Sequence, residues 1–133
     1  MSGVAICRYL LANSAGLIAV VPATRIMAGV LPLNTALPAI SVTQISGQQH
    51  NNLAMASASY LATQRIQVTV LATTYPQTKS ILALVRAALP LSRGTVNGFT
   101  CDAVLPDTEG PDLYDDQTLT HISSVDYMVT FHR

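Results

Sequence analysis

The sequence predicts an α+β fold, a mainly antiparallel β-sheet with helices packed on one face, in a single domain of residues 1–133. Two observations favour this class. Residues 60–73 and 124–133 alternate apolar and polar side chains, which is typical of strands with one buried face. Between them, residues 75–89 repeat apolar residues at helical spacing, which predicts a helix on that face. A chain of this length can bury a core without disulfides or metal.

The N-terminal segment predicts helical structure. Residues 4–12 form a helix whose core side carries Val4, Ile6, Leu10 and Leu11. Ser14 is a candidate cap for a second short turn over residues 15–21, which Pro22 ends. Arg8 and Asn13 interrupt this apolar stretch and no basic region precedes it, so we expect neither a signal peptide nor a membrane span.

Three strands are expected next. Residues 24–28 and 39–46 predict strands, and the glycine and prolines of residues 29–38 indicate a loop between them. The small and polar residues 47–59 predict a mobile hairpin loop. Residues 60–73 form the clearest strand, with one side made of Ile66, Val68 and Val70.

The C-terminal half predicts one helix and two further strands. Thr74 and Gln77 have the spacing of a capping box, and the helix continues to Pro90 with an apolar face of Ile81, Leu84, Val85, Ala88 and Leu89. A turn at residues 92–98 leads to a strand with Phe99, Cys101, Ala103 and Leu105 on one face. An acidic loop over residues 106–117 precedes the last strand, whose apolar side is Val125, Tyr127, Val129 and Phe131.

The composition argues against several functional classes. Half of the residues are hydrophobic and only 11% are charged, so we expect much of the surface to be covered by neighbouring subunits. Seven basic residues balance seven acidic ones, which leaves no net charge to drive nonspecific nucleic-acid binding. Cys7 and Cys101 are interpreted as small buried hydrophobes in a reducing cytosol.

Catalytic and metal-binding motifs are not found. His50, His121 and His132 show no ligand spacing, and there is no GxSxG, HExxH or phosphate-binding glycine loop. We therefore expect no enzyme activity, no cofactor and no metal site. The acidic loop gathers Asp107, Glu109, Asp112, Asp115 and Asp116. A solvated loop is the favoured interpretation, ahead of a protein interface and then of a calcium or glycosidase-type carboxylate site.

Weak motifs follow one another along nearly the whole chain. They are Leu37–Ile40, Ile45–Gly47, Arg65–Val70, Ala72–Tyr75, Val85–Leu89, Gly94–Gly98, Asp112–Asp115 and Ser124–Arg133. In this order they resemble the tail-completion or tail-terminator proteins of long-tailed bacteriophages. Two features depart from the family pattern: Leu71 stands where an aromatic residue is common, and residues 51–59 are variable.

The resemblance implies a structural role. Proteins of that family form a ring, typically a hexamer, on the head-proximal end of the tail tube, where the ring stops tube polymerisation and presents a surface to the head connector. The implied partners are further copies of this chain, the tail-tube protein and a head-completion or connector protein. DNA would pass through the lumen without specific binding. The implied location is the virion, after assembly in the host cytoplasm. Another neck or head-completion adaptor, and a small soluble enzyme or ligand-binding domain, remain as alternatives.

Two segments are candidate contact sites. The uncharged loop can supply hydrogen bonds to the tube protein or to a neighbouring subunit through Gln48, Gln49, His50, Asn51 and Asn52. A mobile loop without a partner is the equal alternative. The acidic loop would line the lumen, where carboxylates repel DNA, or make a contact, either with Arg65, Arg86 or Arg93 of a neighbour or with a connector.

Overall fold

The computed structural model describes residues 2–29, 31–32, 35–49, 61–89, 94–96 and 99–132. Its elements are α1 (Ser2–Ala12), α2 (Ala15–Ile18), a 3-10 turn (Ala23–Arg25), β1 (Ile26–Ala28), β2 (Ala39–Gln49), β3 (Leu61–Ala72), α3 (Tyr75–Ala88), β4 (Gly94–Val96), β5 (Phe99–Glu109), β6 (Leu113–Asp115) and β7 (Thr120–His132). The described strands form one sheet in the order β1-β2-β3-β7-β5-β4. Only β1 and β2 pair in parallel. The predicted α+β class with a mainly antiparallel sheet is therefore confirmed.

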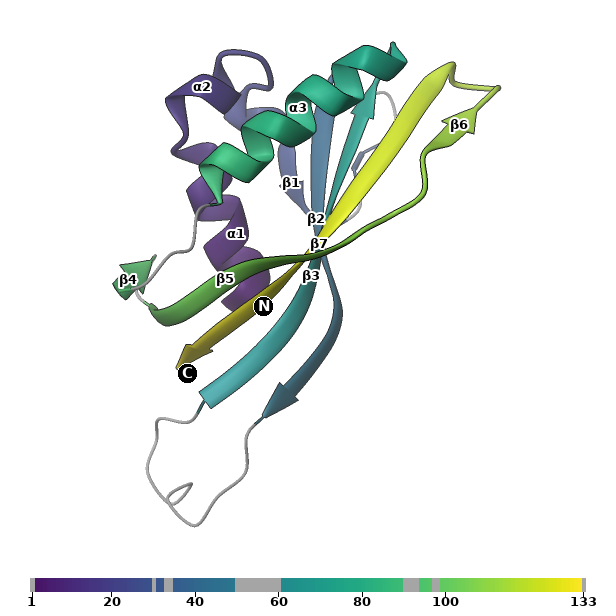
Figure 1. Cartoon of the computed structure of the whole chain (residues 1–133). Coiled ribbons are helices and arrows are strands. Elements are labelled where there is room, and N and C mark those ends of the chain that lie inside the picture. The colour runs from purple at the N-terminus through teal and green to yellow at the C-terminus, as the bar shows by residue number, and fades with distance from the viewer. Residues whose placement is uncertain are drawn as a thin grey trace.

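The helices α1, α2 and α3 lie together on one face of the sheet (Figure 1). The strands below them bury every second residue, as the alternation predicted: Ile66 pairs with Tyr127 and Val68 with Val125, and all four side chains are buried. α3 covers β3 and β7 with Ile81 and other apolar residues of its buried side. Burial of each such side chain stabilises the fold by about 1.5–3 kcal/mol.

Two hydrogen bonds tie α1 to the sheet, the first of them at a close approach near the N-terminal end of the helix. The backbone N–H of Gly3 donates to Oε1 of the buried Gln64, at 2.9 Å. A Cβ atom at position 3 would lie 2.5 Å from that oxygen, so glycine allows the contact. Farther along, Nε of Arg8 donates to the carbonyl of Ile26 in β1, at 3.0 Å.

The edge strand β1 ends at a backbone turn. Gly29 has a φ of 87°, in the left-handed region that favours glycine. Its N–H donates to the carbonyl of Val42, at 2.8 Å, and its own carbonyl accepts from Ser41 Oγ. The chain then leaves the edge, whereas β2 continues through Gln49. Within the described residues, β2 beyond Val42 has no strand on its outer side.

Three local predictions are wrong. Neither Ser14 nor Thr74 makes a side-chain capping hydrogen bond. Pro76 in the first turn of α3 has no N–H to cap, which lowers the need for one. Along β5 the alternation breaks at Asp102, where the register with β7 shifts at a β-bulge. An extra residue reverses the side-chain order, so Leu105 is 46% exposed.

Candidate functional site

The acidic segment, residues 107–116, is mostly strand, and the predicted irregular loop is wrong. β5 continues through Glu109, and β6 adds three residues, both strands pairing with β7. Because β3 occupies the other side of β7 over residues 121–132, β5 and β6 lie one after the other along the same side. Pro106 is tolerated in β5 since an edge strand needs no outward N–H.

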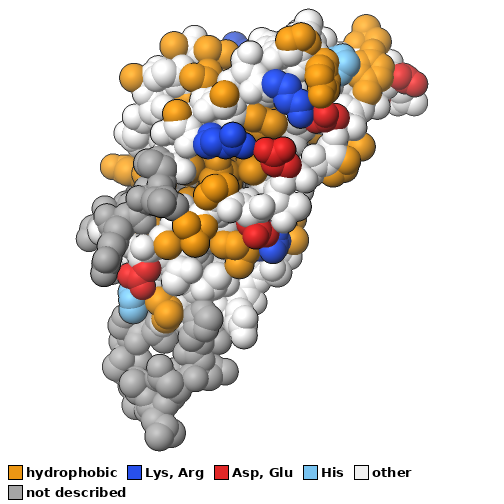
Figure 2. Space-filling view, viewed as in Figure 1, with side chains coloured by type: hydrophobic (Ala, Val, Ile, Leu, Met, Phe, Trp, Pro, Cys, Tyr) orange, Lys and Arg blue, Asp and Glu red, His pale blue; other side chains and the backbone are white. Residues whose placement is uncertain are grey.

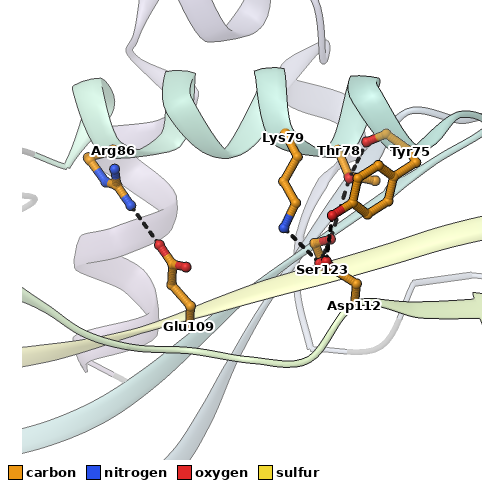
Figure 3. Close-up of polar contacts among 7 residues, drawn as sticks. All are labelled: Tyr75, Thr78, Lys79, Arg86, Glu109, Asp112 and Ser123. Atoms are coloured by element: carbon orange, nitrogen blue, oxygen red, sulfur yellow. Dashed lines mark hydrogen bonds and ion pairs between the residues drawn. The ribbon is translucent and has the colours of Figure 1, made fainter.

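Asp112 ties this segment to α3 (Figure 3). Its carboxylate accepts hydrogen bonds from Tyr75 Oη at 2.8 Å, Lys79 Nζ at 2.8 Å and Ser123 Oγ at 2.7 Å. Thr78 supports the arrangement, since its hydroxyl donates to the carbonyl of Tyr75 at 2.6 Å and lies 3.4 Å from Ser123 Oγ. Side chains from α3 and β7 thus converge on one carboxylate, and we call this cluster the Asp112 latch.

The latch strongly favours the ionised acid. The hydrogen bond from Lys79, followed by those from Ser123 and Tyr75, lowers the pKa of Asp112 to about 2. Because the pKa of Asp112 is lower in the folded chain than in the unfolded chain, the ionised carboxylate stabilises the folded state at pH values above the unfolded pKa. This contribution is lost as the pH falls through about 2. The latch is therefore closed at neutral and moderately acidic pH.

A second ion cluster lies on the face of the sheet away from the helices. Nη1 of Arg65 is 2.5 Å from the Asp107 carboxylate and 3.2 Å from that of Asp126. The hydrogen bond from Arg65 lowers the pKa of Asp107 below its ordinary value. This cluster joins β3, β5 and β7 across the sheet.

A third pair bridges β5 and α3 at the surface. Arg86 Nη2 lies 3.0 Å from Oε1 of Glu109, and both side chains are largely exposed. Basic and acidic side chains accordingly lie next to each other in Figure 2. Gly110 follows at once, and its N–H donates to the carbonyl of Ser124 at 2.9 Å. A Cβ at this position would clash with Ser124 Oγ, so glycine permits the close passage.

The chain thus neutralises most of its own acidic segment. Asp107, Glu109 and Asp112 each have a cation from their own chain. Two of these cations are Arg65 and Arg86, which are the predicted partners on a neighbour. Arg93 lies outside the described residues. Within the part of the chain that the structure describes, Asp115 and Asp116 have no ion pair. Asp115 accepts a hydrogen bond from the backbone N–H of Gln117 at 3.0 Å.

The uncharged contact segment begins inside a strand. Gly47 and Gln48 pair with Gln64 and Thr63 of β3, so the prediction that the loop starts at residue 47 is wrong. Because both faces of β2 are polar here, no alternation of apolar and polar residues indicates a strand in the sequence. Gln48 is exposed, and Gln49 ends β2. His50, Asn51 and Asn52 lie outside the described residues.

An exposed apolar tip at the β6–β7 end was missed by the sequence reasoning. Leu113, Tyr114 and Leu119 are all at least half exposed. His121 packs beside Tyr114, with ring centroids 4.6 Å apart, and near Tyr75 at 6.2 Å. Figure 2 shows hydrophobic side chains around a histidine at this end. The signal was available in the sequence, because apolar residues interleave with acids there, a pattern that fits a contact surface.

A cleft of about 390 Å³ lies on the open face at the same end. Its apolar walls include Leu37, Leu71 and Ile122, and Asp115 is its one ionisable lining residue among those described. A lone carboxylate does not make an acid–base pair. Cys7 and Cys101 are both buried as predicted, and burial raises the pKa of the Cys7 thiol to about 12. Among the described helices, none is long and apolar enough to cross a membrane.

Comparisons with known proteins give a family and a fold. No curated protein matches the chain. A chain in the solved structure titled "Virion of native gene transfer agent (GTA) particle" has the same fold, with a TM-score of 0.68 at 12% identity, over 96% of this chain and 92% of that one. The family model described as "Tail completion protein gp17" matches residues 5–132. The chain therefore belongs to this family of tail-completion proteins.

Proposed function

We propose that this protein is a structural subunit of the tail or neck of a phage-like particle, and that it acts as the tail terminator. Copies form a ring, most simply a hexamer, on the head-proximal end of the tail tube. The ring stops tube polymerisation and joins the tail to the head connector. The protein works by contact and carries out no reaction. It assembles in the host cytoplasm.

Family membership over residues 5–132 is the observation that carries this proposal. The fold shared with a chain of a virion structure supports it. The surface supports it as well, since exposed apolar residues gather at the β6–β7 end while ionic groups are largely paired within the chain. Such surfaces suit protein–protein contact better than binding of a charged small substrate.

The two candidate contact segments have separate roles in this proposal. Gln48, Gln49, His50, Asn51 and Asn52 contact the tail-tube protein or a neighbouring copy at one end of the sheet. At the other end, Asp115 and Asp116 are the acids still available to face the lumen or a partner, because their three acidic neighbours have partners on their own chain. Unneutralised carboxylates do not hold DNA phosphates, so DNA passes without specific binding.

The test is a virion stock whose gene for this chain carries a stop codon, with the wild-type gene supplied in trans as control. A terminator predicts overlong tails that lack heads, seen by electron microscopy, and restoration of normal particles by the supplied gene. Tails of normal length without heads would instead assign the chain to a head-completion adaptor. Normal infectious particles without the chain would refute both roles.

A second test addresses the uncharged segment. Deleting residues 50–57 should leave the helices and the sheet folded, as judged by circular dichroism. The particles should nevertheless show overlong or headless tails. Normal particles from this deletion would remove the contact role of His50, Asn51 and Asn52 and leave the terminator role standing.

A further inference from the structure

Among the described residues, each of the two sides of the sheet has a stretch of strand that lacks a neighbouring strand. On the β1 side, Gly29 turns the chain away, and β2 from Gln44 to Gln49 has no described strand next to it. Its side chains there are uncharged, and neither proline nor charge protects the edge. An unprotected edge of this kind is a template for pairing with another chain.

On the opposite side, β5 has a shorter open stretch. β4 pairs only with residues 99–101 of β5. Residues Ala103–Leu105 pair inward with β7 and have no described strand on the outer side. Pro106, which has no N–H, ends the stretch available for pairing.

The two open stretches lie at the same level of the sheet. Ser46 of β2 pairs with Arg65 of β3, Arg65 with Met128 of β7, and Met128 with Leu105 of β5. One residue farther, Gly47 reaches Val104 through Gln64 and Val129 by the same steps. A line drawn straight across the strands therefore joins the open part of β2 to the open part of β5.

Each open stretch also carries an exposed apolar side chain. Ile45, at the bulge of β2, is 53% exposed, and Leu105 is 46% exposed. They lie at opposite edges of the sheet and do not cover each other within one chain. A contact between the edges of two copies would place both side chains at the interface and lower their exposure to water.

We propose that the open edge of β2 pairs with the open edge of β5 in a second copy of this chain. β2 and β7 run in one direction and β3 and β5 in the other, so the new pair is antiparallel. The contact is head-to-tail, using two different surfaces. Such contacts close into a ring when the rotation between copies allows it, and the shared level of Ser46 and Leu105 across the strands supports pairing between neighbouring copies. The inference rests on the ring proposed above and names its joining surfaces.

The continuous sheet would have a defined inside. Helices cover only one face and form the bulkier layer (Figure 1), which fits the convex side of a ring. The open face would then line the lumen. It carries uncharged polar residues such as Thr63, Gln67 and Thr130, along with the Arg65 cluster.

Cysteine cross-linking in assembled virions tests the pairing. Virions are assembled with Ser46→Cys, with Leu105→Cys, with a mixture of the two, and with the double variant. Residues that face each other on paired strands are close enough for a disulfide. Because tilted strands are staggered in closed sheets, Gln44→Cys and Gln48→Cys are tested in parallel. In the control, Leu119→Cys replaces Leu105→Cys. Leu119 is 64% exposed and lies at the β6–β7 end.

The expected result is disulfide-linked dimers from the mixture, none from either single variant, and a ladder of covalent multimers from the double variant. Dimers from Ser46→Cys alone would mean that two β2 edges pair with each other, and would overturn the proposal. A third outcome is an ordered ring of several copies per virion in which no cysteine at position 44, 46 or 48 cross-links to Leu105→Cys. This outcome would overturn the pairing and leave the ring intact. A virion that contains a single copy would refute the ring itself.

Discussion

The two faces of the sheet differ in polarity although they share the same strands: one is covered by helices and the other is open. On the helix-covered face, Ile66, Val68 and Tyr127 are wholly buried. On the open face, Thr63, Gln67 and Thr69 of β3 are half-buried and polar, and Arg65 bridges two carboxylates there. The first face holds the fold together, whereas the second has polar groups that remain in contact with water. Apolar packing and contact with water are thus separated residue by residue along one strand.

The largest effect should come from the helix-covered face. Ile66→Ala creates a cavity under α1 and should lower the free energy of unfolding by about 2–5 kcal/mol. Its neighbour Gln67→Ala, on the open face, should change it by less than about 0.5 kcal/mol. Urea denaturation of both variants measures the difference. Equal losses would mean that the two faces contribute alike to stability.

A smaller effect is expected from the ion cluster on the open face. Arg65→Met leaves the carboxylates of Asp107 and Asp126 without their shared cation, and their repulsion should lower the thermal midpoint. In the native protein the pKa of Asp107 is lowered, so its stabilising contribution holds above the ordinary carboxyl value and is lost as pH falls below it. The variant should therefore come closer to the native protein at about pH 3 than at neutral pH. Adding Asp107→Asn should recover part of the loss at neutral pH; no recovery would argue against repulsion.

The Asp112 latch should have a local and pH-dependent effect. Because the pKa of Asp112 is lowered to about 2, its contribution to stability is present above the ordinary value of 3.8 and disappears as pH falls through about 2. Asp112→Asn should flatten this part of the stability profile and speed hydrogen exchange in β6. Thermal unfolding across the acidic range checks the first effect, with Asp116→Asn as control. An unchanged profile would show that the latch does not hold the segment.

The smallest effect on stability should come from Asp115 and Asp116. The double variant Asp115→Asn/Asp116→Asn should leave the thermal midpoint unchanged, since no described cation pairs with either acid. Particle measurements then separate the proposed roles. Slowed DNA ejection would indicate a lumen position, and salt-sensitive assembly would indicate an interface. If neither changes, these acids face solvent only.

Sequence periodicity predicted the regular parts of the fold well. β3 alternates throughout and β7 alternates from Val125 onward, so Val68 and Val125 could be assigned to the core from the sequence. The side of β5 could not be assigned, because the bulge at Asp102 adds a residue that no local pattern reveals. The strand at Gly47 and Gln48 was hidden for a related reason, since both faces are polar there.

For the candidate site, the sequence predicted only which acidic residues are present and not which side chains contact them. The acidic residues were identified, but their partners were not, because Tyr75 and Lys79 lie 37 and 33 residues from Asp112 in the sequence. Tertiary structure alone brings α3 over β7 and places these donors around one carboxylate. The prolines at 106 and 111 favoured a loop, whereas an edge strand accommodates the first of them.

The left-handed turn at Gly29 has a consequence for gene dosage. By ending β1 early it leaves the outer side of β2 beyond Val42 without a strand among the described residues, so a chain made beyond the number that particles need would keep this uncharged edge in solution. We expect such surplus chains to associate nonspecifically as their concentration rises. Expression matched to the supply of partners would keep them soluble, and a lysine placed at Ser46 should raise the solubility of overproduced protein at the expense of its assembly.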